Sequence, residues 1–263
     1  MKNLVIGSAG FIGTPFCKYL ESLGEEVIRF DIATKKNDDA RKVKLNLKSI
    51  DRVYFLAWDV GGSKYLFRKD LQLSQLKWNL TLLENVLGQL EEKKEFLFVS
   101  SQFADDCDTV YGVTKKLGEV WTELIKGKCV RVWNAYGVME KNNVKSHVIS
   151  DFVHQAVTTG KIKMMTNGEE WRQFTHVDDL ARAFHAALND KESNKSIFDA
   201  SSYQWVQIKQ VAKIISKLTG AKIIHGTAEG RNHKAYNVGR VPGWFPEVTL
   251  TDGIKRMVAA VKK

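Results

Sequence analysis

The segment that decides the fold is KNLVIGSAGFIG, residues 2–13. Its apolar start predicts a short buried strand, and helical spacing of apolar residues begins at Thr14. Glycines stand at positions 7, 10 and 13 of the intervening turn. The first permits a tight turn, the second lets backbone amides approach a pyrophosphate, and the third allows close helix–strand packing. The spacing is GxxGxxG rather than the commoner GxGxxG. Its place between strand and helix nevertheless favours a dinucleotide site over an ordinary turn.

A carboxylate follows at the position that such a site requires. The apolar run EVIRFDI, residues 26–32, predicts the second strand, and Asp31 lies at its end. A carboxylate there accepts hydrogen bonds from both ribose hydroxyls and repels a 2′-phosphate. Asp31 therefore favours NAD over NADP. Lys35 and Lys36 follow closely and leave room for NADP.

Further strands and helices alternate along the chain. Apolar runs predict strands near residues 52–58, 95–101, 128–134 and 196–200. Helical spacing predicts helices near residues 14–23, 70–90, 111–125, 146–159, 178–189 and 208–218, and one from residue 252. This alternation predicts an α/β fold, a Rossmann-type doubly wound parallel sheet with a small C-terminal α/β substrate-binding part. We expect residues 1–140 plus about 172–200 to form the dinucleotide domain, and about 141–171 plus 201–263 the substrate domain.

Composition narrows the class of protein. The chain has 263 residues, 44% of them hydrophobic, and no linker-like stretch, which predicts one compact unit. No apolar run nears the roughly 20 residues that span a bilayer, and the N-terminal run is too short for a signal peptide. Three unpatterned cysteines suggest a reducing cytoplasm and no metal site. The net charge of +10 comes from dispersed lysines, so attraction for an anionic substrate is favoured over nucleic acid.

The stretch YGVTKK, residues 111–116, offers a catalytic pair. Tyr111 and Lys115 are four residues apart and would share one face of a helix. Ser101 ends the strand near 95–101, at the sheet edge where ligands of open parallel sheets lie. A free tyrosine has a pKa near 10, and we expect the lysine cation to lower the pKa of Tyr111. Taken in isolation, the pair would best be interpreted as an exposed Tyr and Lys on a helix surface. Next to the predicted dinucleotide site, a role of Tyr111 and Lys115 in proton transfer is the preferred interpretation.

Taken together, the motifs resemble one family. GSAGFIG, Asp31, FLAW, FVSSQ, YGVTK, RVWNAYG and RQFTHVDDLARA occur in the order found in extended short-chain dehydrogenases/reductases, the family of NAD-dependent nucleotide-sugar epimerases and dehydratases. The resemblance implies hydride transfer with Ser101, Tyr111 and Lys115 as catalytic residues. LAWDVGGSKYL is similar to the LAAxVGG segment of GDP-mannose 3,5-epimerases and GDP-fucose synthases. A second segment similar to GDP-fucose synthases implies that His147 is an acid; a solvent-facing helix residue is the alternative.

The same resemblance assigns binding residues. For the cofactor it implies Gly7, Gly10, Phe11, Ile12, Gly13, Asp31, Asn46, Leu56, Ala57, Asn79, Tyr111 and Lys115. For the substrate it implies Asn134, Arg172 and Arg231, although a surface salt bridge is the alternative for each arginine. It also implies a homodimer through a four-helix bundle, for which the long helix offers Leu71, Leu76, Leu80, Leu83 and Leu87.

Departures from the family pattern limit the chemistry. Phe103 stands where the 3,5-epimerases and GDP-fucose synthases have a cysteine base, and Cys107 lies nearby. Gln102 and Phe103 replace the Asp-Glu pair of the dehydratases. Only nine residues separate Ser101 from Tyr111, which suggests a more open sugar pocket or a small specialised substrate. The sequence thus predicts an NAD-dependent nucleotide-sugar epimerase acting through a transient 4-keto sugar. The alternatives are a reductase or dehydrogenase of the same fold, or a non-catalytic NAD- or RNA-binding relative.

Overall fold

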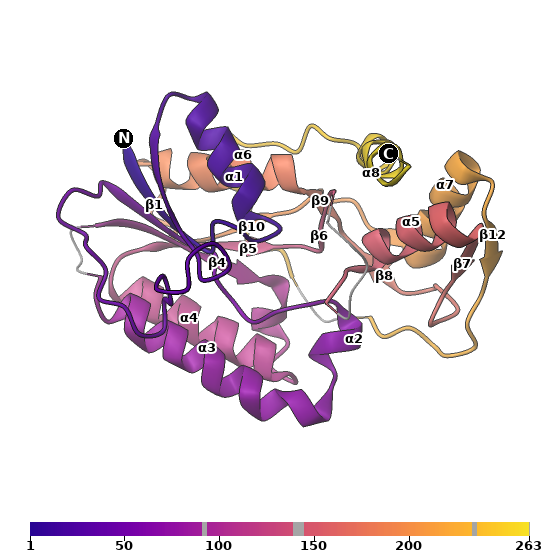
Figure 1. The fold of residues 1–263 in the computed structure, drawn as a ribbon, viewed down its shortest axis with the longest axis horizontal. Coiled ribbons are helices and arrows are strands. Elements are labelled where there is room, and N and C mark those ends of the chain that lie inside the picture. Colours follow the sequence, from indigo (N-terminus) through magenta and orange to yellow (C-terminus); the bar gives the residue numbers. More distant parts are fainter. Residues whose placement is uncertain (91–93, 139–144, 233–235, 263) are drawn as a thin grey trace.

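One parallel sheet organises the molecule. The computed structural model describes residues 1–90, 94–138, 145–232 and 236–262. Its main sheet has six strands in the order β10-β5-β4-β3-β1-β2, all parallel (Figure 1). The strands are β1 (Lys2–Ile6), β2 (Glu26–Phe30), β3 (Arg52–Phe55), β4 (Glu95–Ser101), β5 (Lys128–Val132) and β10 (Ile197–Ala200). The predicted Rossmann-type α/β fold is confirmed.

Helices cover both faces of this sheet. Helices α1 (Gly13–Ser22) and α6 (Val177–Asn189) lie on one face, and α3 (Gln72–Leu87) and α4 (Val110–Leu124) on the other (Figure 1). Along β1, Val5 packs in the first layer, while Leu4 and Ile6 pack in the second. This period of two is the strand geometry that sends successive side chains to opposite faces. Because both faces are covered, the central strands β1, β3 and β4 are largely apolar and buried.

A second hydrophobic core lies beyond the sheet. It is built from α5 (Val148–Thr159), α7 (Ile208–Thr219) and α8 (Leu250–Val261), with β7 (Lys161–Lys163) paired in parallel to β12 (Lys222–Ile224). The sequence analysis did not predict β12. The remaining short elements are α2 (Ser63–Leu66), η1 (Lys69–Leu71), η2 (Gln102–Asp105), β6 (Ala135–Tyr136), β8 (Trp171–Arg172), β9 (Thr175–His176) and β11 (Val206–Gln207). None of the helices in the described ranges has the length and apolar character needed to cross a bilayer.

The long helices α3 and α4 expose an apolar face. Two of the leucines predicted for a dimer interface, Leu83 and Leu87, are instead buried in the subunit's own core, so that part of the prediction is wrong. The reason is that α3 uses them to cover the sheet. The exposed apolar side chains are Leu73, Trp78 and Leu80 on α3, and Val113, Leu117, Val120 and Leu124 on α4.

Candidate active site

A cavity of about 720 Å³ lies at the carboxyl ends of the sheet strands, bounded on its other side by residues of α5 and β8. It brings together most of the residues predicted from sequence. Those that line it are Gly7, Gly10, Phe11, Ile12, Gly13, Asp31, Leu56, Ala57, Ser101, Tyr111, Lys115, Asn134, His147, Arg172 and Arg231. Asn46 and Asn79 do not line it.

The glycine loop is held so tightly that side chains are excluded. Gly7 has φ +92°, and a Cβ on it would lie 2.5 Å from the backbone nitrogen of Ala57. A Cβ on Gly13 would lie 2.0 Å from the carbonyl oxygen of Gly7. The Asp31 carboxylate accepts hydrogen bonds from the amides of Ala9 (2.9 Å) and Ala33 (2.8 Å), which fixes it beside this loop. With the first-turn amides of α1 pointing outward, this cradle fits a dinucleotide.

The two asparagines outside the cavity lie in different settings. Asn46 is exposed. Asn79 is fully buried; its amide oxygen accepts a 2.9 Å hydrogen bond from the Asp59 backbone nitrogen, and its amide nitrogen donates to the Asp59 carbonyl (3.2 Å). Asn79 therefore holds the turn that follows β3. Sequence reasoning missed Arg41, which lines the cavity; its guanidinium carbon lies 3.5 Å from the centroid of the Trp78 ring.

Ser101 and Tyr111 meet in the middle of the cavity. Ser101 ends β4, and Tyr111 lies in the first turn of α4, which Thr109 caps by accepting a hydrogen bond from Gly112 N (3.0 Å). The Ser101 hydroxyl donates to the side-chain oxygen of Gln102 (3.1 Å). Burial raises the pKa of Tyr111 to about 12, and the hydrogen bond with Ser101 opposes that rise.

The predicted lowering of the Tyr111 pKa is therefore wrong in this structure. Lys115 is buried, and its ammonium group donates a 2.6 Å hydrogen bond to the Val99 carbonyl. It lies 5.9 Å from the centroid of the Tyr111 ring. Loss of water around the phenolate outweighs a cation that points elsewhere. Burial also lowers the pKa of Lys115 well below its usual value.

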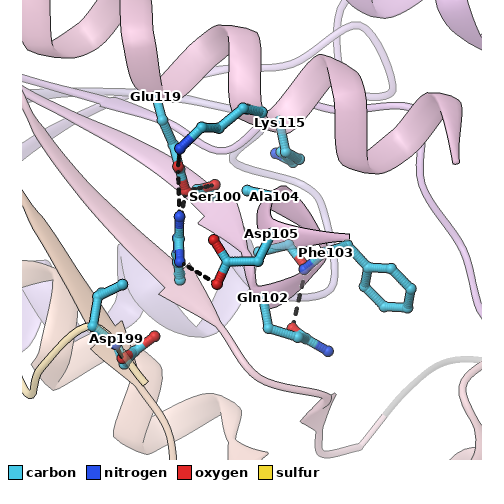
Figure 2. A network of polar contacts seen from close by, with 12 residues as sticks. Ser100, Gln102, Phe103, Ala104, Asp105, Lys115, Glu119 and Asp199 are labelled. Atoms are coloured by element: carbon cyan, nitrogen blue, oxygen red, sulfur yellow. Dashed lines mark hydrogen bonds and ion pairs between the residues drawn. The ribbon is translucent and has the colours of Figure 1, made fainter. Parts of the chain in front are cut away.

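A buried ionic network joins the elements that carry these residues (Figure 2). Arg131 on β5 is only 2% exposed, and its guanidinium binds the Glu119 carboxylate through two hydrogen bonds of 2.7 and 2.8 Å. It also binds Asp105 in η2 (2.8 Å). The Ser100 hydroxyl donates to Glu119 (2.6 Å). The network thus ties the end of β4, the short η2 segment and α4 to one strand. Sequence reasoning missed it; the signal available was an arginine inside the apolar run KCVRVWN, where a charge requires a partner.

The opposite side of the cavity carries the predicted substrate residues. His147 occupies the N-cap position of α5 but makes no side-chain capping hydrogen bond there. Its ring stacks on that of Phe11 with centroids 6.0 Å apart, and burial lowers its pKa. It does not face open solvent. Asn134 adopts φ +37°, which asparagine tolerates better than most residues, and donates to the Gln173 carbonyl (2.8 Å).

The two arginines differ in how their charge is compensated. The Arg172 guanidinium donates to the carbonyls of Trp171 (2.7 Å) and Arg231 (2.8 Å). Within the described residues no carboxylate forms an ion pair with Arg172. Arg231 does form one, with Asp108 at 2.5 Å. Arg172 therefore offers the stronger attraction for an anion in the cavity.

The structure also shows where Phe103 and Cys107 lie, the residues at and near the position of the cysteine base of the 3,5-epimerases. Phe103 lines the cavity and packs edge-on against the Tyr111 ring, with centroids 5.8 Å apart. Cys107 is exposed and lies outside the lining. Across the part of the chain that the structure describes, no group of three or more His, Cys, Asp or Glu side chains could hold a metal ion.

A parallel sheet with a glycine cradle, a carboxylate after the second strand and a Ser–Tyr–Lys wall is the architecture of a Rossmann-type dinucleotide enzyme. Residues 3–200 match the NAD-dependent epimerase/dehydratase family, and the chain belongs to that family. It is 27% identical to the UDP-N-acetyl-alpha-D-glucosaminuronate decarboxylase of Bacillus cytotoxicus, over 94% of this chain and 89% of that protein. It is 24% identical to a putative UDP-glucose 4-epimerase of Methanocaldococcus jannaschii, over 98% of both.

Solved structures agree on the fold. A mutant UDP-glucuronic acid 4-epimerase from Bacillus cereus, in complex with UDP-4-deoxy-4-fluoro-glucuronic acid and NAD, superposes with a TM-score of 0.79. It is 20% identical and covers 100% of this chain and 99% of its own. The UDP-glucose 4-epimerase of Thermus thermophilus in complex with NAD gives a TM-score of 0.74 at 19% identity, over 99% of both chains.

Proposed function

We propose that this protein is an NAD-dependent nucleotide-sugar epimerase that works through a transient 4-keto sugar. One observation carries the proposal: a single cavity joins the glycine cradle and Asp31 to the wall formed by Ser101, Tyr111 and Lys115. The family match and the epimerases among the relatives support the same class of reaction. Phe103 in place of a base argues against chemistry at C3 or C5.

The cofactor would lie along the first half of the cavity. Gly7, Gly10 and Gly13 shape its pyrophosphate site, and Asp31 would receive the adenosine ribose hydroxyls. We propose NAD rather than NADP because Asp31 lines the cavity, whereas Lys35 and Lys36 do not. When bound, NAD supplies a nicotinamide ring that accepts and returns a hydride.

The proton would move at the Tyr111 oxygen. Because its pKa is raised to about 12, Tyr111 carries its proton at neutral pH, and this is the proton it would give to a keto oxygen. In the oxidising half of the cycle Tyr111 would take the proton of the C4 hydroxyl, with Lys115 in the same wall of the cavity. Ser101, oriented by Gln102, would hold the same sugar oxygen.

The substrate would occupy the other half. Arg172, whose charge no described carboxylate pairs, would bind the diphosphate, with Arg231 and Asn134 beside it. The neutral His147 ring would border the sugar. We also keep the proposed division into a dinucleotide domain, residues 1–140 plus about 172–200, and a substrate domain from the rest. A cytoplasmic location stays a prediction from the sequence.

The direct test is turnover of candidate sugars. Purified protein with NAD and UDP-, GDP- or dTDP-linked sugars should yield a C4 epimer of one of them, detected by chromatography or NMR. Since an epimerase returns the hydride to the sugar, absorbance at 340 nm should show no net NADH. Failure of every sugar to turn over, with NAD bound, would contradict the proposal.

A reductase or dehydrogenase is the second candidate. Two of the relatives are named as reductases, including the dTDP-4-dehydro-6-deoxyglucose reductase of Escherichia coli at 24% identity. In that case the same mixtures should consume or produce NADH in proportion to sugar. The absorbance measurement therefore separates the two candidates in one experiment.

We further propose a homodimer through the exposed face of α3 and α4. Val113, Leu117, Val120 and Leu124 fall at helical spacing on one side of α4, and Leu73 and Leu80 continue that side on α3. Replacing Val120 and Leu124 together with Glu should yield a monomer by light scattering, because charges would be buried in the interface. The control is Leu23→Glu, an exposed leucine on another face. A wild-type monomer at micromolar concentration would refute the dimer.

A further inference from the structure

Lys115 lies against three aromatic rings. Its ammonium nitrogen is 3.8 Å from the centroid of Trp58, 4.7 Å from that of Phe98 and 5.9 Å from that of Tyr111. Its hydrogen bond in the described structure goes to a backbone carbonyl, that of Val99. The nearest ring belongs to Trp58, a position at which the LAAxVGG pattern has alanine. The indole thus departs from that pattern.

Packing against neighbouring aromatic rings fixes the position of the Trp58 ring. The indole makes edge contacts with Phe98 (5.4 Å) and Phe55 (6.0 Å). Its N–H is buried and has no hydrogen-bond partner among the described residues. A buried indole usually satisfies this donor. The face of the ring is presented to the Lys115 ammonium group.

Few charges compete for Lys115. On its own helix, the Glu119 carboxylate is already bound by Arg131. On β5, Cys129 faces it, and burial raises the pKa of that thiol so that it stays neutral. Tyr111 is protonated at neutral pH. The loop after β3 contributes Trp58, and β4 contributes Phe98 and the Val99 carbonyl; none of these groups is a carboxylate.

We propose that Trp58 is a positioning residue that keeps Lys115 protonated and held in the wall of the cavity. The face of an indole attracts a cation, and this attraction is strongest where water is excluded. The effect opposes burial, which by itself favours the neutral amine. Since removal of the ring would destabilise only the charged form, the pKa of Lys115 should fall further. This inference rests on the proposed function for its catalytic meaning but not for its measurement.

The titration of Lys115 is the test. In protein labelled with ¹³C-lysine, the Cε shift of Lys115 is followed against pH, and the signal is assigned by its loss in Lys115→Met. We expect Trp58→Leu to lower the midpoint by about one pH unit, and Trp58→Phe, which keeps a weaker ring face, by less than half of that. The control is Phe67→Leu, which removes a cavity-lining ring that makes no contact with a cation in the described structure; its midpoint should stay within about 0.2 units of the wild type.

A folded Trp58→Leu protein with the wild-type midpoint would overturn the inference. Thermal melting shows whether the variant folds, and Trp58→Met supplies the same comparison if it does not. In turnover, the basic limb of the pH profile should move to lower pH by the same amount in Trp58→Leu. Because the NMR titration needs no substrate, failure of every sugar to react would refute the proposed function while leaving the titration result standing.

Discussion

Replacing Tyr111 by Phe should lower turnover of the nucleotide sugar at least about 100-fold, the usual contribution of a general acid–base group. The substitution removes one oxygen from a buried ring and leaves the edge contact with Phe103 in place. Its direct effect is therefore on proton transfer at C4. Steady-state kinetics with the best sugar, together with a binding measurement for NAD, checks this prediction.

Cofactor affinity separates this effect from misfolding. In Tyr111→Phe, NAD should bind within a few fold of wild type, because the glycine cradle and Asp31 are unchanged. Tyr19→Phe, which removes a hydroxyl from a tyrosine outside the cavity, should retain full turnover. Unchanged turnover in Tyr111→Phe would refute the catalytic assignment of the whole Ser101–Tyr111–Lys115 wall.

Glu119→Gln should be the most destabilising of the proposed substitutions. Glu119 is 1% exposed and holds two hydrogen bonds from the buried Arg131 guanidinium and one from Ser100. Loss of one partner of a buried ion pair costs about 3–5 kcal/mol of unfolding free energy, and Asp105 would remain as a carboxylate partner of Arg131. Urea denaturation followed by tryptophan fluorescence measures this change. Turnover should fall as well, because the same contacts fix η2 and α4.

Glu21→Gln is the matched control. Glu21 also binds an arginine, Arg29, through more than one hydrogen bond, but this pair lies on the surface. Water can solvate both groups, so the loss should be no more than about 1 kcal/mol. Equal losses in the two variants would mean that burial does not set the strength of the Arg131 network.

The Arg131 network supports the short segment between Ser101 and Tyr111. With nine residues between Ser101 and Tyr111, the chain has little freedom to build a separate support there. Asp105 instead forms an ion pair with the buried Arg131, and this contact holds η2 against β5. The Ser101–Tyr111 spacing is thus set by contacts to β5 as well as by the length of the loop.

The sequence alone determined the architecture and the approximate positions of the main strands and helices, but not short elements such as β12. Buried strands of a sheet covered on both faces are largely apolar, and apolar residues recur every three to four positions along an amphipathic helix. Both signals are local in the sequence. The glycine loop, Asp31, Ser101 and the YxxxK pair were recognisable for the same reason. Each depends on residue type and on position relative to one strand or helix.

Tertiary structure decided what depends on distant neighbours. Whether Lys115 lowers the pKa of Tyr111 depends on burial and on where the ammonium group points. The rings beside that group come from β4 (Phe98) and from the loop after β3 (Trp58). Likewise, Asn79 proved to hold a turn, and Leu83 and Leu87 proved to be core, because the sheet lies on that side of α3. Electrostatic and packing energies depend on the distance between groups in space and on the exclusion of water. The order of residues along the chain gives neither quantity.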